Sequence, residues 1–134
     1  MKPSLLLAAI AGIAPLAVAA PAAAQPDWSH AQRINVALSS FKFAPATLQL
    51  RAGQPVILHL ENSGSGGHDF SAPAFFKAAR VRSEDAGKLT GGAVDVDGHG
   101  SVDIALIPAA GTYALRCTHA FHSMFGMKGS IVVR

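Results

Sequence analysis

One cysteine, one histidine and one methionine near the end of the chain have the types and spacing of metal ligands. Cys117, His122 and Met127 follow one another as Cys-x4-His-x4-Met. Thiolate and thioether sulfur suit Cu(I), whereas imidazole suits both oxidation states of copper. Two imidazoles, a thiolate and a weak axial thioether form a compromise between the geometries of the two states, so little has to move when one electron arrives or leaves. The pattern indicates one copper ion used for electron transfer.

The second imidazole must come from elsewhere in the chain, and His68 is the best candidate. It follows the glycine-rich run 63–67 and is expected to begin a strand at the same end of the fold. His59 lies in the middle of an expected strand, on its polar face, and is interpreted as a surface histidine. His30, near the start of the mature chain, and His99, in a tight turn, are expected to be solvated.

Two residues of the same loop remain alternatives. His119 follows Cys117 by two positions, and its side chain would point inward if the strand continued past the cysteine. Met124 could replace Met127 as the axial ligand, although only two positions separate it from His122 and it lacks the strand phase described next.

Strands on either side of the loop 118–126 are expected to position the two sulfurs. Side chains two positions apart in a strand point the same way. Cys117 therefore shares the face of Leu115, and Met127 shares the face of Ile131. Both faces carry core residues, so a hairpin would place both sulfurs inward at the same end of the fold.

The remainder of the mature chain is predicted to be mostly β, with turn signals between short strands. Alternation of apolar and polar residues marks strands with one buried face, and many such strands favour a β-sandwich. The segment 74–89 instead suits short helical turns. The alternating segments are 34–38, 48–50, 56–60, 94–96, 102–106, 113–115 and 131–133.

The first residues have the features of a secretory signal. Lys2 precedes the apolar run 5–18, and small residues end in Ala22-Ala23-Ala24. We expect residues 1–24 to be cleaved as a signal peptide, leaving an exported domain of residues 25–134 with no membrane span. Cleavage at Ala20 and retention as an uncleaved membrane anchor are the alternatives.

The net charge of the chain bears on whether it binds nucleic acid. The formal charge of +3 falls to +2 once Lys2 is removed, and the basic residues are scattered, so nucleic acid is not an expected partner.

The chain has a single cysteine, although exported proteins normally pair their cysteines. The lone Cys117 is therefore either an inert buried thiol, half of an intermolecular link, or a thiol occupied by a metal.

Three segments resemble the cupredoxin family of plastocyanin and azurin. They are the loop and final strand from Tyr113 to Val133, the motif Gly67-His68-Asp69-Phe70, and the segment 43–53. The resemblance implies an all-β Greek-key cupredoxin β-sandwich of about eight strands with a short helical insertion. It also implies one type 1 (blue) copper per chain and periplasmic electron transfer. Carried over position by position, the ligands are His68, Cys117, His122 and Met127. Many members have Asn where this chain has Asp69, whose expected role is to accept a hydrogen bond from the region of Cys117 and Thr118.

The expected function is therefore a monomeric carrier that shuttles single electrons between redox partner proteins. The loop residues Phe121, Met124 and Phe125 would form an apolar patch around His122 for transient docking. A copper chaperone or reservoir is the alternative, since the loop is rich in His and Met. An enzyme is not expected, because copper enzymes that reuse this fold need further histidine-rich sites and the sequence has no His-x-His pair.

Overall fold

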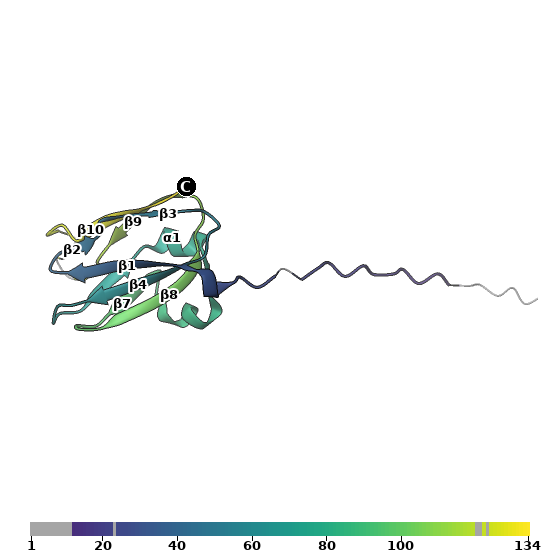
Figure 1. The fold of residues 1–134 in the computed structure, drawn as a ribbon, viewed down its shortest axis with the longest axis horizontal. Helices are drawn as coiled ribbons and strands as arrows, with labels where there is room; N and C mark the ends of the chain where they lie inside the picture. The colour runs from purple at the N-terminus through teal and green to yellow at the C-terminus, as the bar shows by residue number, and fades with distance from the viewer. Residues whose placement is uncertain (1–11, 23, 120–121, 123) are drawn as a thin grey trace, which may run out of the picture.

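Two five-stranded sheets form the fold of the computed structural model, which describes residues 12–22, 24–119, 122 and 124–134 (Figure 1). The first sheet has the order β2 (Lys42–Ala44), β1 (Gln32–Ser39), β4 (Val56–Asn62), β8 (Ser101–Ile107), β6 (Arg80–Val81). The second has the order β3 (Thr47–Leu50), β10 (Lys128–Val133), β9 (Gly111–Arg116), β5 (His68–Ser71), β7 (Ala93–Val96). The pairs β1–β4 and β3–β10 are parallel, and the other pairs within the sheets are antiparallel.

The predicted β-sandwich with a short helical insertion is confirmed, and the described residues form ten strands in place of the expected eight or so. The two additional strands are β2 and β6, which have three and two residues and are too short to show an alternating pattern. The segment 74–89 contains most of helix α1 (Pro73–Ala78), then β6, then the 3-10 helix η2 (Ser83–Lys88). A further 3-10 helix, η1 (Trp28–His30), precedes β1.

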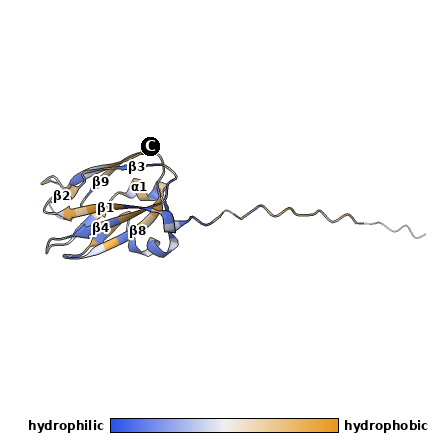
Figure 2. Ribbon diagram, in the orientation of Figure 1, coloured by the Kyte–Doolittle hydropathy of each residue, from blue (hydrophilic) through white to orange (hydrophobic). Residues whose placement is uncertain are grey.

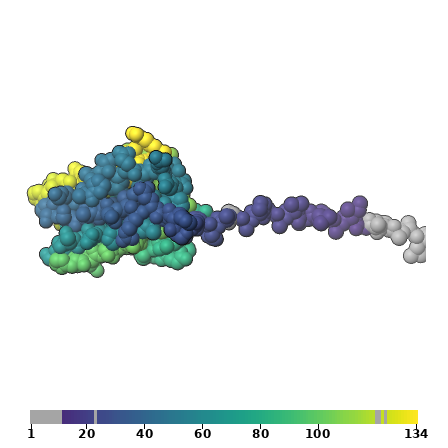
Figure 3. Space-filling model, viewed as in Figure 1, coloured from purple at the N-terminus to yellow at the C-terminus, as the bar shows by residue number. Residues whose placement is uncertain are grey.

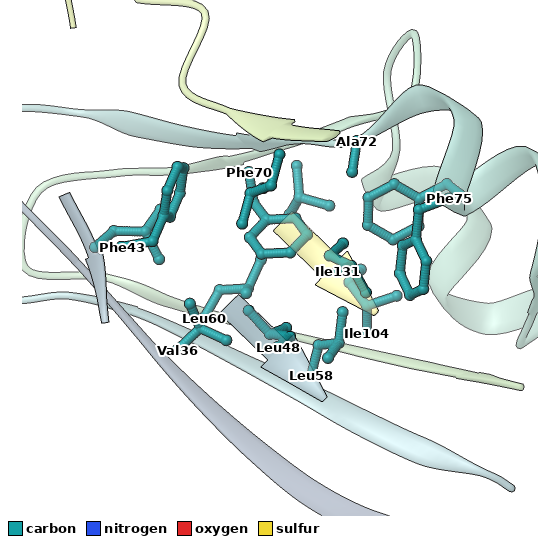
Figure 4. Close-up of a cluster of buried hydrophobic side chains, with 14 of the residues drawn as sticks. Val36, Phe43, Leu48, Leu58, Leu60, Phe70, Ala72, Phe75, Ile104 and Ile131 are labelled. Carbon is teal, nitrogen blue, oxygen red and sulfur yellow. The ribbon is translucent and has the colours of Figure 1, made fainter. Parts of the chain in front are cut away.

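The core lies between the sheets and follows the alternation in the sequence. Hydrophobic and hydrophilic residues are interspersed along β1 and β8 (Figure 2). Leu58 and Leu60 of the first sheet and Phe70 and Ile131 of the second are fully buried and point into the same space (Figure 4). Burying each side chain of this size stabilises the fold by about 1.5–3 kcal/mol. The core thus holds the two sheets as a support for the loops at their ends.

The pairing of β9 with β10 determines where the two sulfur-bearing residues lie. Lys128 pairs with Arg116, so Met127 and Cys117 are the next residues beyond the paired strands. The Cys117 N–H donates to the Met127 carbonyl over 3.1 Å, which extends the pairing by one residue. Both residues are fully buried, in agreement with the strand phase expected from the sequence.

The described part of the N-terminal segment extends away from the sandwich (Figures 1 and 3). Its large apolar side chains Ile13, Leu16 and Val18 are exposed. Among the described residues, no helix has the length and apolar character needed to cross a membrane. The boundary between signal and mature domain at residues 24 and 25 stays a prediction.

A buried carboxylate joins the helical insertion to the first sheet. Asp85 of η2 accepts hydrogen bonds from the Ala105 N–H of β8 at 2.9 Å and from the Lys88 ammonium at 2.6 Å. Nη2 of the Arg82 guanidinium lies 2.8 Å from Oδ2, the oxygen that also accepts from the Ala105 N–H, whereas Lys88 binds Oδ1. Burial raises the pKa of Asp85, but the hydrogen bonds and the two positive charges outweigh it and hold the pKa below its usual value of 3.8. The charged form is therefore the one that stabilises the fold.

We expect Asp85→Asn to lower the free energy of unfolding by about 2–3 kcal/mol near neutral pH, the size of the contribution from hydrogen bonds to a charged group. Because the pKa is lowered in the folded state, this contribution is complete above 3.8 and is lost as the pH falls through the lowered folded-state value. Urea denaturation of the copper-free protein across that range should therefore show the two proteins converging at low pH. Glu84→Gln, one residue away and exposed, is the matched control. A pH-independent difference between wild type and Asp85→Asn would contradict this account.

Candidate metal centre

The side chains of His68, Cys117 and His122 converge at one end of the sandwich. The Nδ1 atoms of His68 and His122 lie 3.1 Å apart. The Cys117 sulfur lies 3.4 Å from Nδ1 of His122 and 4.0 Å from Nδ1 of His68. Three donor atoms within 4.8 Å of one another can bind one ion together. A thiolate with two imidazoles is a soft and borderline set that fits copper.

Each of these residues occupies a different structural element. His68 is the first residue of β5, and Cys117 follows the last residue of β9. His122 lies in the connecting loop, where its N–H donates to the His119 carbonyl and its own carbonyl accepts from the Met127 N–H over 2.9 Å. The strands therefore fix two donors, and a hydrogen-bonded turn presents the third to them.

The two methionines of the loop have different surroundings. Met127 is 0% exposed and its carbonyl binds the Cys117 N–H, so it lies inside the fold beside the cysteine. Met124 is 76% exposed. The burial of Met127 next to Cys117 agrees with the strand phase that favours it over Met124.

Asp69 ties β5 to the cysteine end of β9. Its backbone N–H points at the Cys117 sulfur over 3.5 Å, and its carboxylate accepts from the Thr118 N–H over 2.6 Å and from the Thr118 hydroxyl. The hydrogen bond to Thr118 is the one expected from the sequence. These contacts hold the His68 and Cys117 backbones in register, and partners of this kind orient metal ligands.

Burial favours the neutral forms of His68 and Cys117 when no ion is bound. It lowers the pKa of His68, and the imidazoles of His122 and His119 lower that pKa further. Burial raises the pKa of the Cys117 thiol. A neutral imidazole has a lone pair available for a metal, whereas the thiol must release its proton when an ion binds. The site therefore favours a cation that binds thiolate strongly.

His119 does not join the three donors. Its Nε2 atom lies 3.9 Å from Oδ1 of Asp95, and its ring centre is 6.5 Å from that of His68. The strand of Cys117 ends at Arg116, so the continuation that would have turned His119 inward does not occur.

The other histidines lie away from the centre. His59 is on β4, where its Nδ1 atom lies 2.6 Å from Oδ1 of Asp103. His30 and His99 are exposed, in η1 and in the turn before β8. These positions match the surface and turn locations expected from the sequence.

Sequence reasoning missed Phe41, an aromatic residue beside the centre. It lies in the turn between β1 and β2 with a φ of 59°, a left-handed conformation that is uncommon for residues other than glycine. Its ring meets the His122 ring edge-on at 5.2 Å between centres and lies 5.1 Å from the Phe125 ring. No motif marks this residue, because its proximity depends on how the two sheets are stacked.

Three exposed apolar side chains, Phe41, Met124 and Phe125, form what we call the apolar rim. The Phe41 ring contacts the rings of His122 and Phe125, and Met124 follows His122 by two residues in the same loop. Phe125 is 66% exposed and Phe41 is 41% exposed. Phe121, the third residue expected in the docking patch, lies outside the described residues. The rim therefore contains Met124 and Phe125, which were expected from the sequence, and Phe41, which was not.

Comparison with known proteins gives one family and several solved structures. A family model described as "Cupredoxin-like domain" matches residues 7–133. Auracyanin B is 22% identical, with a TM-score of 0.56 over 78% of this chain and 89% of that chain. Auracyanin from the photosynthetic bacterium Roseiflexus castenholzii is 20% identical, with a TM-score of 0.58 over 78% and 98%.

A similar fold also occurs within a longer chain, that of a multi-copper oxidase. A multi-copper oxidase from Pseudomonas thermotolerans is 18% identical, with a TM-score of 0.62 over 83% of this chain but only 31% of that chain. These identities establish likeness of fold alone. A comparison with curated proteins finds no match.

Proposed function

The chain belongs to the cupredoxin family. We propose that it binds one type 1 copper and is a periplasmic electron carrier, which shuttles single electrons between redox partners. The observation that carries the proposal is the convergence of His68, Cys117 and His122 on one point beneath an exposed apolar rim. When bound there, copper supplies the one-electron couple of Cu(II) and Cu(I). The protein's own residues hold the donors in place and give partners access to one of them.

The proposed ligands are His68, Cys117 and His122, with Met127 as the weak axial donor. Three of the four are buried, and the hydrogen bonds of Asp69 and Met127 fix the backbone around the cysteine. A site held this firmly suits a carrier, because a set of donors that changes little between oxidation states lowers the cost of each transfer.

His122 is the proposed exit for the electron. It is half-buried, whereas His68 and Cys117 are buried. The rim of Phe41, Met124 and Phe125 borders it, and a small apolar patch favours a partner that binds briefly and leaves quickly. We propose that redox partners dock on this rim and that the carrier acts as a monomer.

Export to the periplasm is part of the same proposal, with residues 1–24 removed and residues 25–134 retained. The extended conformation and exposed apolar side chains of the described leader residues support it. The carrier is not proposed to be an enzyme, because the sequence has no His-x-His pair to build a further copper cluster.

A copper chaperone or reservoir is the second candidate. The exposure of Met124, and of His119 at 38% of its side chain, favours it, since both could take copper from the centre toward solvent. A carrier keeps its copper through many cycles, whereas a chaperone gives it up to a partner.

Added charge on the rim separates these functions. We expect Phe125→Glu and Met124→Glu to keep the visible spectrum of the copper protein and to slow electron exchange by about tenfold, because a carboxylate must lose water on docking. The measurement is the stopped-flow rate with a redox partner, or the electron self-exchange rate. Gln54→Glu adds the same charge in the turn before β4, at the end of that strand far from His68. Unchanged rates in both rim variants would favour a reservoir or another exit.

A further inference from the structure

A second group of metal-ligating side chains lies beside the copper centre, on the other face of β5. Carboxylate oxygens of Asp69 and Asp95 and an imidazole nitrogen of His119 all lie within 4.8 Å of one another. His68 and Asp69 are consecutive in β5, so their side chains point to opposite faces of the sheet. The first group therefore faces the inside of the sandwich, and the second lies on the opposite face of β5, where Asp69 is buried and Asp95 is exposed.

Among the described residues, no Lys or Arg forms an ion pair with either carboxylate of Asp69 and Asp95. Asp69 of β5 and Asp95 of β7 stand directly opposite each other in an antiparallel pair. Like charges in this arrangement destabilise a sheet. The His119 imidazole faces them, but its Nε2 atom lies 3.9 Å from the Asp95 oxygen, which is too far for a hydrogen bond. A cation among the three side chains would bind all of them and remove the repulsion.

The geometry leaves donor capacity free on each side chain. Thr118 donates one hydrogen bond to each oxygen of the buried Asp69 carboxylate. A carboxylate oxygen has two acceptor positions, so each retains one. The side chains of Asp95 and His119 are 76% and 38% exposed, which gives an ion and its remaining waters a path from solvent.

Gly67 makes room for the imidazole of this group. A Cβ atom at that position would lie 3.3 Å from Cε1 of His119, closer than an ordinary contact. Any side chain there would require the imidazole to shift by a few tenths of an ångström. The absence of a side chain at Gly67 therefore leaves the imidazole room at its place beside Asp95.

We propose that Asp69, Asp95 and His119 form a second, surface site for a divalent transition-metal ion, Cu(II) or Zn(II). Two carboxylates and one imidazole are oxygen and nitrogen donors without sulfur, so the site favours these ions over Cu(I). Its His119 ring lies 5.5 Å from the His122 ring, centre to centre, so the two sites are neighbours but share no donor. The site is distinct from the type 1 centre in its face of the sheet, its donors and its oxidation-state preference.

The test uses the mature protein already carrying one copper, with Zn(II) added and its uptake followed by calorimetry. We expect one further Zn(II) to bind while the visible copper absorption stays constant. His119→Ala and Asp95→Asn should each weaken that binding by at least about tenfold, the effect of losing a group that holds a metal in place. His99→Asn and Asp97→Asn, in the turn after β7, are matched controls and should bind Zn(II) like the wild type.

Three results would overturn the proposal. The first is that the copper-loaded protein binds no Zn(II). The second is that His119→Ala and Asp95→Asn bind Zn(II) with the same affinity as the wild type. The third is that Zn(II) binding bleaches the copper absorption, which would place Zn(II) in the inner site. A second arm adds Cu(II) to the same copper-loaded protein and records its electron paramagnetic resonance spectrum. We expect a second signal, typical of copper bound by nitrogen and oxygen, that is absent in His119→Ala. A signal that persists in that variant would also count against the site.

Discussion

Replacing Cys117 with serine is expected to abolish the intense visible absorption of the copper-loaded protein while the sandwich stays folded. The colour depends on charge transfer from a thiolate to copper, and Cys117 is the only cysteine in the sequence. Serine offers a hydroxyl that is a poor ligand for Cu(I), so we also expect copper to bind more weakly. The measurement is a visible spectrum during titration with Cu(II), beside circular dichroism of the copper-free variant.

The fold should tolerate this change because the core does not depend on the cysteine. The core includes large buried side chains from both sheets, and serine removes little volume. Its hydroxyl can accept from the Asp69 N–H that now points at the sulfur. His59→Ala is the control, because it removes a side chain that can bind metal at a position away from the centre. His59 lies on β4, where it faces Asp103 of β8. Retention of the full band in Cys117→Ser would refute the proposed site.

Two of the four proposed donors could be predicted from strand phase in the sequence. The period of two along β9 and β10 predicts that Cys117 and Met127 point inward, and both are fully buried. The same reasoning separates Met127 from Met124, which lies in the loop without a strand partner. Local rules were sufficient here because each residue lies within one position of a regular strand.

Other features depend on contacts between distant segments, which no local pattern encodes. Phe41 reaches His122 only because the turn between β1 and β2 folds against the loop after β9. The opposition of Asp69 and Asp95 needs the register of β5 against β7, which the sequence leaves undetermined. The strand pairing, rather than the residue types, creates these neighbours.

Replacing the proposed axial ligand Met127 is expected to have the second large effect, which is a change in the reduction potential of the copper. We expect Met127→Leu to retain the visible absorption and to raise the potential by on the order of 50–100 mV, since about 1.4 kcal/mol corresponds to 59 mV for one electron. The reason is that the thioether is a weak donor whose loss costs Cu(II) more than Cu(I). Cyclic voltammetry of the copper protein gives the potential directly.

Met124→Leu is the matched control, because it makes the same change at an exposed position in the same loop. Its potential should stay near that of the wild type. Leucine at the buried position 127 conserves most of the volume, so its cost in folding free energy should be below about 1.5 kcal/mol. A shift in Met124→Leu without one in Met127→Leu would mean that the loop rearranges to bring Met124 to the copper. The burial of Met127 beside Cys117 would then reflect core packing alone, and the axial ligand would belong to the more exposed part of the loop.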